Sequence, residues 1–414
     1  MSDNLTLSGI RVLDLTRSIA GPWAVRMLAD AGAEVIKVEP LAGDFIRQLP
    51  AHAGEFSSGF FRQANSGKRS VCIDLHTAAG IDLVMQLIPH ADVVMHNMRP
   101  NAARRLNMVP ERIHEINPSA IFCSVSGYGD NSVFVEKPGQ DVAIQAMTGI
   151  SELTGVAGGE PAVPIWSMVD TLTSAYTYIG IMSALHARAS RGLDRLSVQV
   201  SMAQCSATLH DVGPYLLAQG EKVSIERSGQ FHPFLVLRGV VAVQDGFIAI
   251  SAFRNRDWAR LAPLIGFGGE LLSFDERRGR KREIEERAQS LFAHMTIEDA
   301  LAQLKDAGVP AHQAIESLES VSQTGLFQEH NMLVQTEGPT LVAGIIHRKH
   351  SAEALLGGSD ALGGSNLYAL HEILGLEKGA ILDLLSEGII GCEPDILEDL
   401  VAQCSDAMAS GDVA

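Results

Sequence analysis

The alternation of short β-rich runs with helical segments in the first half of the chain constrains the fold more than any other feature. Runs rich in Val, Ile and Leu indicate strands at residues 9–15, 33–39, 71–75, 93–96 and 121–125. Helical segments fit between these runs, near residues 22–31, 79–89 and 101–116. This β-α-β-α order predicts a parallel sheet with helices on both faces. We therefore expect an α/β fold with a Rossmann-like large domain.

The strand-to-helix turns of such a sheet predict where a ligand binds. In doubly wound parallel sheets, ligands gather beyond the carboxyl ends of the strands. Three turns should therefore line one crevice, at residues 16–22, 97–100 and 126–129. No GxGxxG sequence follows the first strand, which disfavours a nicotinamide or flavin site. Without those glycines, Glu39 at the end of the second strand is expected to be a surface carboxylate.

The character of the sequence changes near residue 220. Beyond it, two apolar runs flank Gln244-Asp245-Gly246, which indicates a β-hairpin. We predict a smaller α/β domain at residues 226–334 and a large domain at residues 1–225, which residues 335–414 complete. The last residues, 405–414, are small and polar, so we expect them to fray.

Composition narrows the classes of partner. The chain has 414 residues and a formal net charge of −17, which disfavours nucleic acid and anionic membranes, because both select a positive protein surface. Its five cysteines are scattered, without a CxxC motif or a Cys/His cluster, so we expect neither disulfides nor a metal site. The most apolar long segment, residues 172–185, is too short and too polar to span a bilayer. A reducing cytoplasm, without a membrane partner, is the expected setting.

Asp170 is the first candidate for chemistry. It stands between residues 163–169 and a long apolar run that extends through Leu185. A carboxylate in such surroundings costs free energy unless it caps a helix, pairs or takes part in catalysis. We therefore expect Asp170 as a helix N-cap, as a nucleophile, or as both. We further expect the helix dipole to keep the carboxylate ionised.

Several short stretches, in their order and spacing, resemble the class III coenzyme A transferase family, whose superfamily also includes the alpha-methylacyl-CoA racemases. The resemblance extends from about residue 8 to residue 390. The stretches that carry it are Leu7–Leu15, Ala20–Pro22, Gly32–Pro40, Asn65–Ser70, Asn97–Pro100, Ser126–Gly129, Pro138–Asp141, Val169–Asp170, Asp245–Gly246, Ala307–Pro310 and Leu362–Asn366.

The resemblance implies that Asp170 is the nucleophile of a CoA transfer from an acyl-CoA donor to a free carboxylic acid. In the family, the aspartate forms a mixed anhydride and then an aspartyl-CoA thioester, which the acceptor carboxylate attacks. CoA thioesters are then substrates, and no permanently bound cofactor or metal is expected. The resemblance also implies an interlocked homodimer, which would keep water away from the anhydride.

Positions that contact CoA are implied by the same resemblance. They fall on Ile19, Ala20, Asn65, Lys68, Asn97, Arg105 and Lys137. Charge supports part of this set, because basic side chains near strand-end loops can neutralise the phosphates of CoA. Those basic residues are Lys68, Arg99, Arg105 and Lys137. The first loop departs from the formyl-CoA transferase pattern at Arg17 and Ile19, so we expect the adenine and pantetheine contacts to differ in detail.

A transferase and a racemase share this fold and this aspartate. Racemisation needs an acid/base group on each face of the substrate carbon, and the racemases carry a His in a Gly-His-Asp turn. Here the turn contains Gln140, which cannot shuttle a proton but can orient a carboxylate or an anhydride. The racemases' further glutamate aligns with Arg254. His232 is a possible substitute acid/base group, although a hydrogen-bonded loop histidine is expected there. The glutamine in the turn and the arginine at the position of the glutamate both favour the transferase.

Two other hypotheses remain open from the sequence. A CoA-binding protein without catalysis would keep the fold, but the intact Asp170 argues against it. Arg17 and Arg47 would favour a C4 or C5 dicarboxylate as the acceptor, because guanidinium groups bind carboxylates bidentately. Succinyl-CoA, a common donor in the family, is the expected donor.

Overall fold

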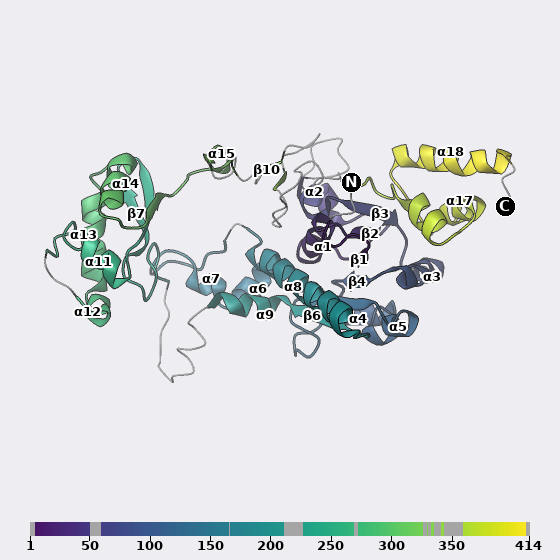
Figure 1. Cartoon of the computed structure of the whole chain (residues 1–414), viewed down its shortest axis with the longest axis horizontal. Helices are drawn as coiled ribbons and strands as arrows, with labels where there is room; N and C mark the ends of the chain where they lie inside the picture. The colour runs from purple at the N-terminus through teal and green to yellow at the C-terminus, as the bar shows by residue number, and fades with distance from the viewer. Residues whose placement is uncertain are drawn as a thin grey trace. The chain divides into compact units, whose positions relative to one another are not determined.

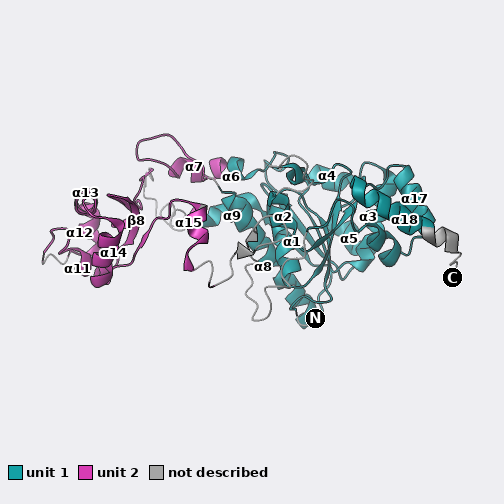
Figure 2. Ribbon diagram, turned by 90° about the horizontal axis from the view of Figure 1, so that it is seen from above, with its two compact units in different colours: residues 1–144, 166–209, 331–414 teal, residues 145–165, 210–330 magenta. Residues whose placement is uncertain are grey.

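The computed structural model describes residues 5–49, 59–164, 166–210, 227–268, 272–325, 329, 333–334, 341–342 and 359–410. The chain forms two compact units, which Figure 2 distinguishes by colour. The first unit contains residues 1–144, 166–209 and 331–414, and the second contains residues 145–165 and 210–330. Residues 145–165, which the sequence pattern assigned to the large domain, thus belong to the second unit.

The first unit is built on a six-stranded parallel sheet with the strand order β3-β2-β1-β4-β5-β6 (Figure 1). Its strands are β1 Arg11–Leu15, β2 Glu34–Glu39, β3 Lys68–Cys72, β4 Val93–His96, β5 Ile121–Ser126 and β6 Ser197–Ser201. The strand order reverses between β1 and β4, which is the switch point where doubly wound sheets bind ligands. The predicted parallel sheet is confirmed.

Apolar clusters pack against both faces of the central strands, whose successive residues point to opposite sides of the sheet. Val12 packs in a cluster with residues of α1 (Ala20–Asp30) and α8 (Met168–Arg191). Leu13, the next residue, packs in a separate cluster with residues of α3 (Ala78–Leu87). Strands covered on both faces are nearly continuous apolar runs, which explains why the sequence pattern identified them.

Further helices of this unit connect the strands or follow them. They are η1 Phe45–Gln48, α2 Gly59–Asn65, η2 Ile88–His90, α4 Pro100–Arg105, α5 Pro110–Ile116, α9 Met202–Ala207, η5 Tyr368–Ile373, α17 Lys378–Ser386 and α18 Pro394–Ser410. The single helix predicted for residues 101–116 is wrong, since α4 and α5 are separate. Asn107 lies between them in the left-handed region, at φ 55°, and Pro110 starts the second helix.

Residues near the C-terminus cover the outer edge of β3. The backbone N–H of Ser70 donates to Asp360 Oδ2 over 3.0 Å, and that of Cys72 donates to Asn366 Oδ1 over 2.9 Å. Because β3 is an edge strand, these side chains satisfy amide groups that no neighbouring strand can reach.

The expectation of fraying beyond residue 405 is wrong as far as residue 410. Helix α18 continues to Ser410, and it buries Leu400 and Cys404, which lie one turn apart on the same face. None of the described helices is long and apolar enough to cross a membrane. The strand-rich segment predicted at residues 335–350 lies outside the described residues except for β11 Leu341–Val342, which pairs with β10 Leu333–Val334.

The second unit contains a three-stranded antiparallel sheet, β7-β8-β9. Its strands are β7 Arg238–Val243, β8 Gly246–Ser251 and β9 Ala311–Gln313. Val243 pairs with Gly246 across the turn, which confirms the predicted hairpin. The helices of the unit are α7 Ile150–Leu153, α11 Asn255–Leu261, α12 Phe274–Gly279, α13 Lys281–Phe292, α14 Ile297–Asp306 and α15 Leu318–Ser322.

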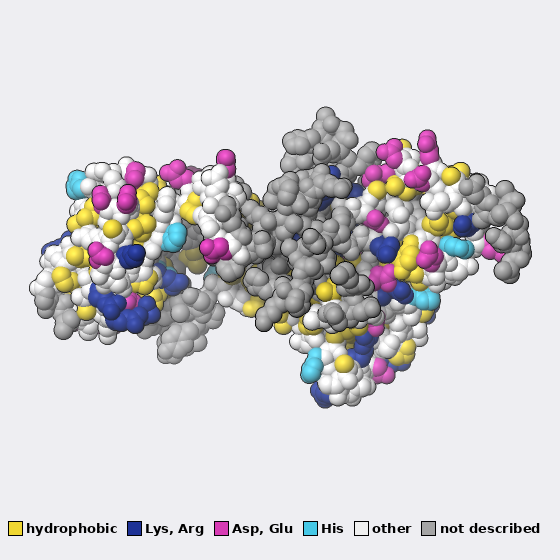
Figure 3. Space-filling view, turned by 45° about the horizontal axis from the view of Figure 1, so that its top comes forward, with side chains coloured by type: hydrophobic (Ala, Val, Ile, Leu, Met, Phe, Trp, Pro, Cys, Tyr) yellow, Lys and Arg dark blue, Asp and Glu magenta, His cyan; other side chains and the backbone are white. Residues whose placement is uncertain are grey.

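A buried aromatic core and paired surface charges characterise this second unit. Trp258 and Phe267 are each 1% exposed, and their ring centroids are 5.4 Å apart. On α13, Arg282 pairs with Glu286 over 2.8 Å at the i,i+4 spacing. Charged side chains of both signs lie on the visible face of this unit, at the left of Figure 3.

Candidate active site

Asp170 lies in the first turn of α8 but does not cap it. The helix begins at Met168, and Ser167 occupies the N-cap position without a side-chain hydrogen bond. The backbone N–H of Asp170 instead donates to Asp141 Oδ2 over 2.9 Å. The N-cap prediction for Asp170 is therefore wrong, since the carboxylate that accepts from this helix start belongs to Asp141.

A hydroxyl group fixes the start of α8 against the start of α1. The Ser174 hydroxyl lies 2.7 Å from the carbonyl oxygen of Ala20 and 2.8 Å from that of Asp170. Ser174 is fully buried, and Ala20 is 4% exposed. This contact holds Asp170 beside the loop that follows β1.

A pocket of about 270 Å³ surrounds Asp170 at the carboxyl ends of the central strands. Its lining comes from the loops after β1 and β4, from the end of β5 and the loop after it, and from the starts of four helices, α1, α6 (Asp141–Met147), α8 and α9. The lining residues are Ser18, Ala20, Asn97, Val125, Ser126, Gly127, Gly139, Gln140, Asp141, Val142, Asp170 and Met202. The expectation that the three strand-end turns line one crevice is confirmed. The volume suits a short acyl group rather than a whole CoA molecule, since pockets for drug-sized ligands span about 300–1,000 Å³.

Two glycines allow the loops on one side of the pocket to meet. A Cβ atom on Gly127 would lie 2.6 Å from the Cα atom of Gly139, which is closer than non-bonded carbon atoms approach. The loop after β5 and the loop that precedes α6 (Asp141–Met147) can therefore touch only because both positions lack side chains. This contact brings Gln140 and Asp141 to the pocket.

The electrostatics of the pocket oppose ionisation of Asp170. Burial, and second the neighbouring Asp141 carboxylate, raise the pKa of Asp170 from 3.8 to about 7. Two carboxylates in one site disfavour a second negative charge. The expectation that the helix dipole keeps Asp170 ionised is therefore wrong at acidic pH, because desolvation and Asp141 outweigh the dipole.

The structure brings some of the predicted site residues together. Asp170, Gln140, Ala20 and Asn97 all line the pocket, and Ile19 is the N-cap residue of α1 beside them. Sequence reasoning assigned no role to Ser18, Asp141 or Met202. Asp141 was within a stretch that resembled the family, but its contact with Asp170 spans 29 positions in the chain, and no local pattern indicates it.

Three predicted phosphate ligands lie outside the lining. Arg99, Arg105 and Lys137 are exposed. Arg99 is two positions from Asn97 and Lys137 is two positions from Gly139, so both flank the pocket rather than enter it. The Lys137 ammonium lies 4.7 Å from the centre of the Phe134 ring.

Lys68 and Asn65, two of the predicted CoA contacts, are buried in this structure. Lys68 begins β3 and is 4% exposed. Its ammonium donates to Asp14 Oδ2 over 2.9 Å, to the Pro22 carbonyl over 2.8 Å and to Asn65 Oδ1 over 2.9 Å. An ammonium has three protons, so all of its donors are used within the fold. Burial lowers the pKa of Lys68 to about 8.

Asn65 is part of the same buried arrangement. Besides accepting from Lys68, it donates through Nδ2 to the Phe61 carbonyl over 3.1 Å, and it is 1% exposed. Lys68 and Asn65 thus stabilise the region between α1 and β3 in this structure, and their predicted contact with CoA stays a prediction.

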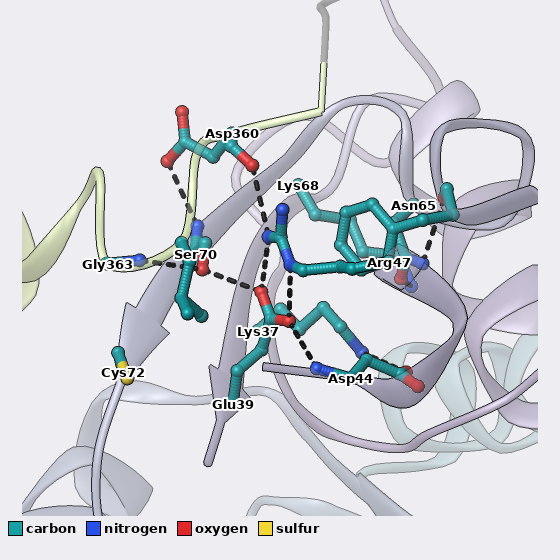
Figure 4. A network of polar contacts seen from close by, with 12 residues as sticks. Lys37, Glu39, Asp44, Arg47, Asn65, Lys68, Ser70, Cys72, Asp360 and Gly363 are labelled. Carbon is teal, nitrogen blue, oxygen red and sulfur yellow. Dashed lines mark hydrogen bonds and ion pairs between the residues drawn. The ribbon is translucent and has the colours of Figure 1, made fainter. Parts of the chain in front are cut away.

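Arg47 and Glu39 form a second buried network, shown in Figure 4. Arg47 donates to both Glu39 oxygens, over 2.6 and 2.8 Å, and to the carbonyl of Asp360 over 3.1 Å. The Ser70 hydroxyl donates to Glu39 Oε1 over 2.7 Å. The surface position expected for Glu39 is wrong, since it is 1% exposed. Arg47 is 3% exposed, so it is not available to hold a dicarboxylate.

Other polar side chains have structural roles. Nδ1 of His232 accepts hydrogen bonds from the backbone N–H groups of Phe234 and Leu235, each over 3.1 Å, which confirms the expected loop histidine. Arg254 pairs with Asp257 over 2.6 Å. Among the described residues, no group of three or more His, Cys, Asp or Glu side chains could hold a metal ion.

The fold and the pocket define a doubly wound α/β protein with a half-buried aspartate at the ligand crevice. Comparison with known families gives a match to CoA-transferase family III over residues 7–354. The chain belongs to this family, and it is an enzyme that transfers CoA.

Individual relatives agree with this assignment. The chain is 30% identical over 356 residues to a succinate–glutarate CoA-transferase of Agrobacterium fabrum, with 82% of this chain and 88% of the relative covered. It is 28% identical to the succinyl-CoA:glutarate CoA-transferase of Mus musculus, with 93% and 90% covered. A crystal structure of a CaiB/BaiF family protein from Brucella suis superposes with a TM-score of 0.75 at 29% identity, covering 90% of this chain and 100% of that one.

Proposed function

We propose that this enzyme moves CoA from a short dicarboxylyl-CoA donor, succinyl-CoA, to a free carboxylic acid through covalent intermediates on Asp170. The observation that carries the proposal is the half-buried Asp170 carboxyl group in a small pocket at the switch point of the sheet. The names of two relatives pair succinate or succinyl-CoA with glutarate, and a pocket of about 270 Å³ suits acyl groups of this size.

The proposed reaction consists of four acyl transfers. The Asp170 carboxylate attacks the donor thioester, and CoA thiolate leaves as a mixed anhydride forms. The thiolate then attacks the aspartyl carbonyl, which releases the donor acid and gives an aspartyl-CoA thioester. The acceptor carboxylate attacks this thioester, so a second anhydride forms and the thiolate leaves again. Attack of the thiolate on the acceptor acyl group forms the product thioester and restores Asp170.

The residues around Asp170 support these steps in distinct ways. Asp141 holds the backbone of Asp170 and raises the pKa of its carboxyl group, so the ionised form is a stronger base than an ordinary carboxylate. Gln140 lines the pocket and carries an amide that can donate to an anhydride or carboxylate oxygen. Because the group that is attacked is activated as a thioester, the scheme needs no permanently bound cofactor.

The described lining residues include no histidine, whereas racemisation needs two acid/base groups on opposite faces of a carbon. This favours the transferase over an alpha-methylacyl-CoA racemase.

We also propose that the active enzyme is a homodimer, which light scattering after gel filtration measures directly. A cytoplasmic location stays a prediction based on the scattered cysteines.

The test is to trap the covalent intermediate. The enzyme is incubated with succinyl-CoA and hydroxylamine, digested and analysed by mass spectrometry for a hydroxamate at Asp170. Asp170→Asn is the inactive control, and Asp82→Asn, at an exposed position of α3, controls for the change of residue type. A hydroxamate that forms in wild type and in Asp82→Asn, but not in Asp170→Asn, supports the proposal.

A panel of free acids then identifies the acceptor. Succinyl-CoA and acetyl-CoA are each combined with C4 and C5 dicarboxylates and with short monocarboxylates, and thioester products are quantified. Absence of the hydroxamate together with exchange of the α-proton in deuterated water would replace the transferase by the racemase.

A further inference from the structure

Ser18 has an unusual backbone conformation in the pocket wall. Its φ angle is +68°, and it is one of four non-glycine residues at positive φ in the part of the chain that the structure describes. Residues other than Gly, Asn and Asp rarely adopt a positive φ angle, because this backbone conformation costs free energy. The other three residues, Asn107, Arg195 and Leu237, do not line the pocket. Such local strain tends to persist at functional positions.

The Asp44 carboxylate holds Ser18 in this conformation. The backbone N–H of Ser18 lies 3.2 Å from Asp44 Oδ2 and 3.4 Å from Oδ1. Asp44 is 1% exposed, and its own position is fixed. Lys37 Nζ lies 3.5 Å from Asp44 Oδ2, and the Asp44 backbone N–H donates to Glu39 Oε2 over 3.1 Å. Figure 4 shows Asp44 with these partners.

The residues before Ser18 are held equally firmly. Asn97 accepts from the backbone N–H of Arg17 over 2.9 Å and donates to its carbonyl over 2.7 Å. Lys37 donates to the Thr16 carbonyl over 2.7 Å. Residues 16–18 are therefore held by one side chain of β2 and by side chains of the loops that follow β2 and β4.

The hydrogen bonds that hold residues 16–18 do not involve the Ser18 hydroxyl, which is therefore available to bind a ligand. The backbone N–H of Ser18 is occupied by Asp44, and within the described chain the hydroxyl makes no hydrogen bond. Ser18 lines the same pocket as Asp170. A hydroxyl there can donate one hydrogen bond and accept others.

We propose that Ser18 is a substrate-contacting residue, whose hydroxyl donates to the acyl or anhydride oxygen in the Asp170 pocket, and that Asp44 is a positioning residue that sets the Ser18 backbone. This inference rests on the proposed function, because it takes the pocket as the site of acyl transfer. It adds a donor from the loop after β1 to the amide of Gln140, which comes from a different loop of the pocket lining.

Two substitutions at Ser18 separate contact from backbone strain. Ser18→Ala removes the hydroxyl and keeps the strain, whereas Ser18→Gly removes both and is at least as stable, since Gly populates positive φ freely. We expect both variants to lower kcat/KM about tenfold for the donor and acceptor that the acid panel selects, as the loss of one hydrogen bond implies. Asn107→Gly, at a left-handed position away from the pocket, is the matched control and should keep wild-type kinetics.

Asp44 is tested through its dependence on Ser18. Asp44→Asn should lower kcat/KM in the wild-type background but have little further effect in the Ser18→Ala background, because a positioning residue acts through the group it positions. If Asp44→Asn fails to fold, the two Ser18 variants still decide the question. Wild-type kcat/KM in both Ser18→Ala and Ser18→Gly would overturn the inference.

Asp170→Asn, measured alongside, separates the two proposals. Turnover by Asp170→Asn would refute the proposed function. An inactive Asp170→Asn with fully active Ser18 variants would refute only the role of Ser18.

Discussion

Replacing Asp170 by Asn should stabilise the protein, and the gain should depend on pH. The structure raises the pKa of Asp170 from 3.8 to about 7 through burial and the Asp141 charge. In the unfolded chain an aspartate titrates near 3.9. Between about pH 4 and pH 7 the unfolded state therefore binds fewer protons at this group than the folded state does. Stability from Asp170 is complete below about pH 4 and is lost as the pH rises to 7.

The size of the effect follows from the pKa difference. A difference of about 3 corresponds to about 4 kcal/mol, at about 1.36 kcal/mol for each pKa unit. Asp170 is only partly buried, so water screens part of this cost, and we expect about 2 kcal/mol. Asn has nearly the same shape and carries no charge. Asp170→Asn should therefore exceed wild type by about 2 kcal/mol at pH 8 and by little at pH 4.

Urea unfolding at five pH values between 4 and 8.5 measures this difference directly, because the free energy of unfolding is obtained for both proteins under each condition. Asp82→Asn, at an exposed site, is the control and should follow wild type throughout. A gain of equal size at pH 4 and pH 8 would show that Asn packs better rather than that ionisation is costly. No gain at either pH would refute the raised pKa.

Four further outcomes are expected. The kcat/KM of wild type should rise with pH to a plateau above about 7, since the attacking group is the Asp170 carboxylate with a pKa of about 7. Asp141→Asn should move the midpoint of this pH profile to lower pH. An unmoved midpoint would exclude repulsion between the two carboxylates as a cause of the raised pKa. Lys68→Met should cost about 3–5 kcal/mol in urea unfolding, because it leaves a buried carboxylate unpaired. Gly127→Ala should lower kcat/KM about 100-fold by separating two pocket loops, and unchanged kinetics would show that the loops adapt. Thr77→Ala, which removes a helix cap, should cost about 1 kcal/mol and leave kinetics unchanged.

The sheet was predictable from the sequence because its strands are buried on both faces. Val12 and Leu13 point to opposite sides, and both find apolar partners, so the strands are apolar runs that stand out along the chain. The crevice followed from topology alone, since parallel strands present their carboxyl ends on one edge. Topology placed the turns that contain Ala20 and Asn97 at this edge, whereas Gln140 and Asp170 were assigned to the site through the family resemblance.

Buried charge pairs were not predictable, because no local pattern shows which charged side chains the fold buries together, whether the partners are 54 or 8 positions apart. Lys68 meets Asp14 at a separation of 54 positions, so a lysine beside a loop was interpreted as a phosphate ligand. Glu39 and Arg47 were each assigned to exposed or substrate-binding positions, although they neutralise one another. The role of Ser18 was not predictable either. Serine is common in loops, and the residue type of Ser18 does not indicate its left-handed φ angle.

The cover on the β3 edge has a consequence for the nascent protein. The backbone N–H groups of Ser70 and Cys72 have no acceptor until Asp360 and Asn366 are made, which are 290 and 294 positions later in the chain. At about 5–20 residues per second on the ribosome, the strand carries open amide groups for roughly 15–60 seconds after it emerges. During that interval the growing polypeptide offers a template for unwanted strand pairing, and the interval ends once residues 360–366 are synthesised and can cover the strand.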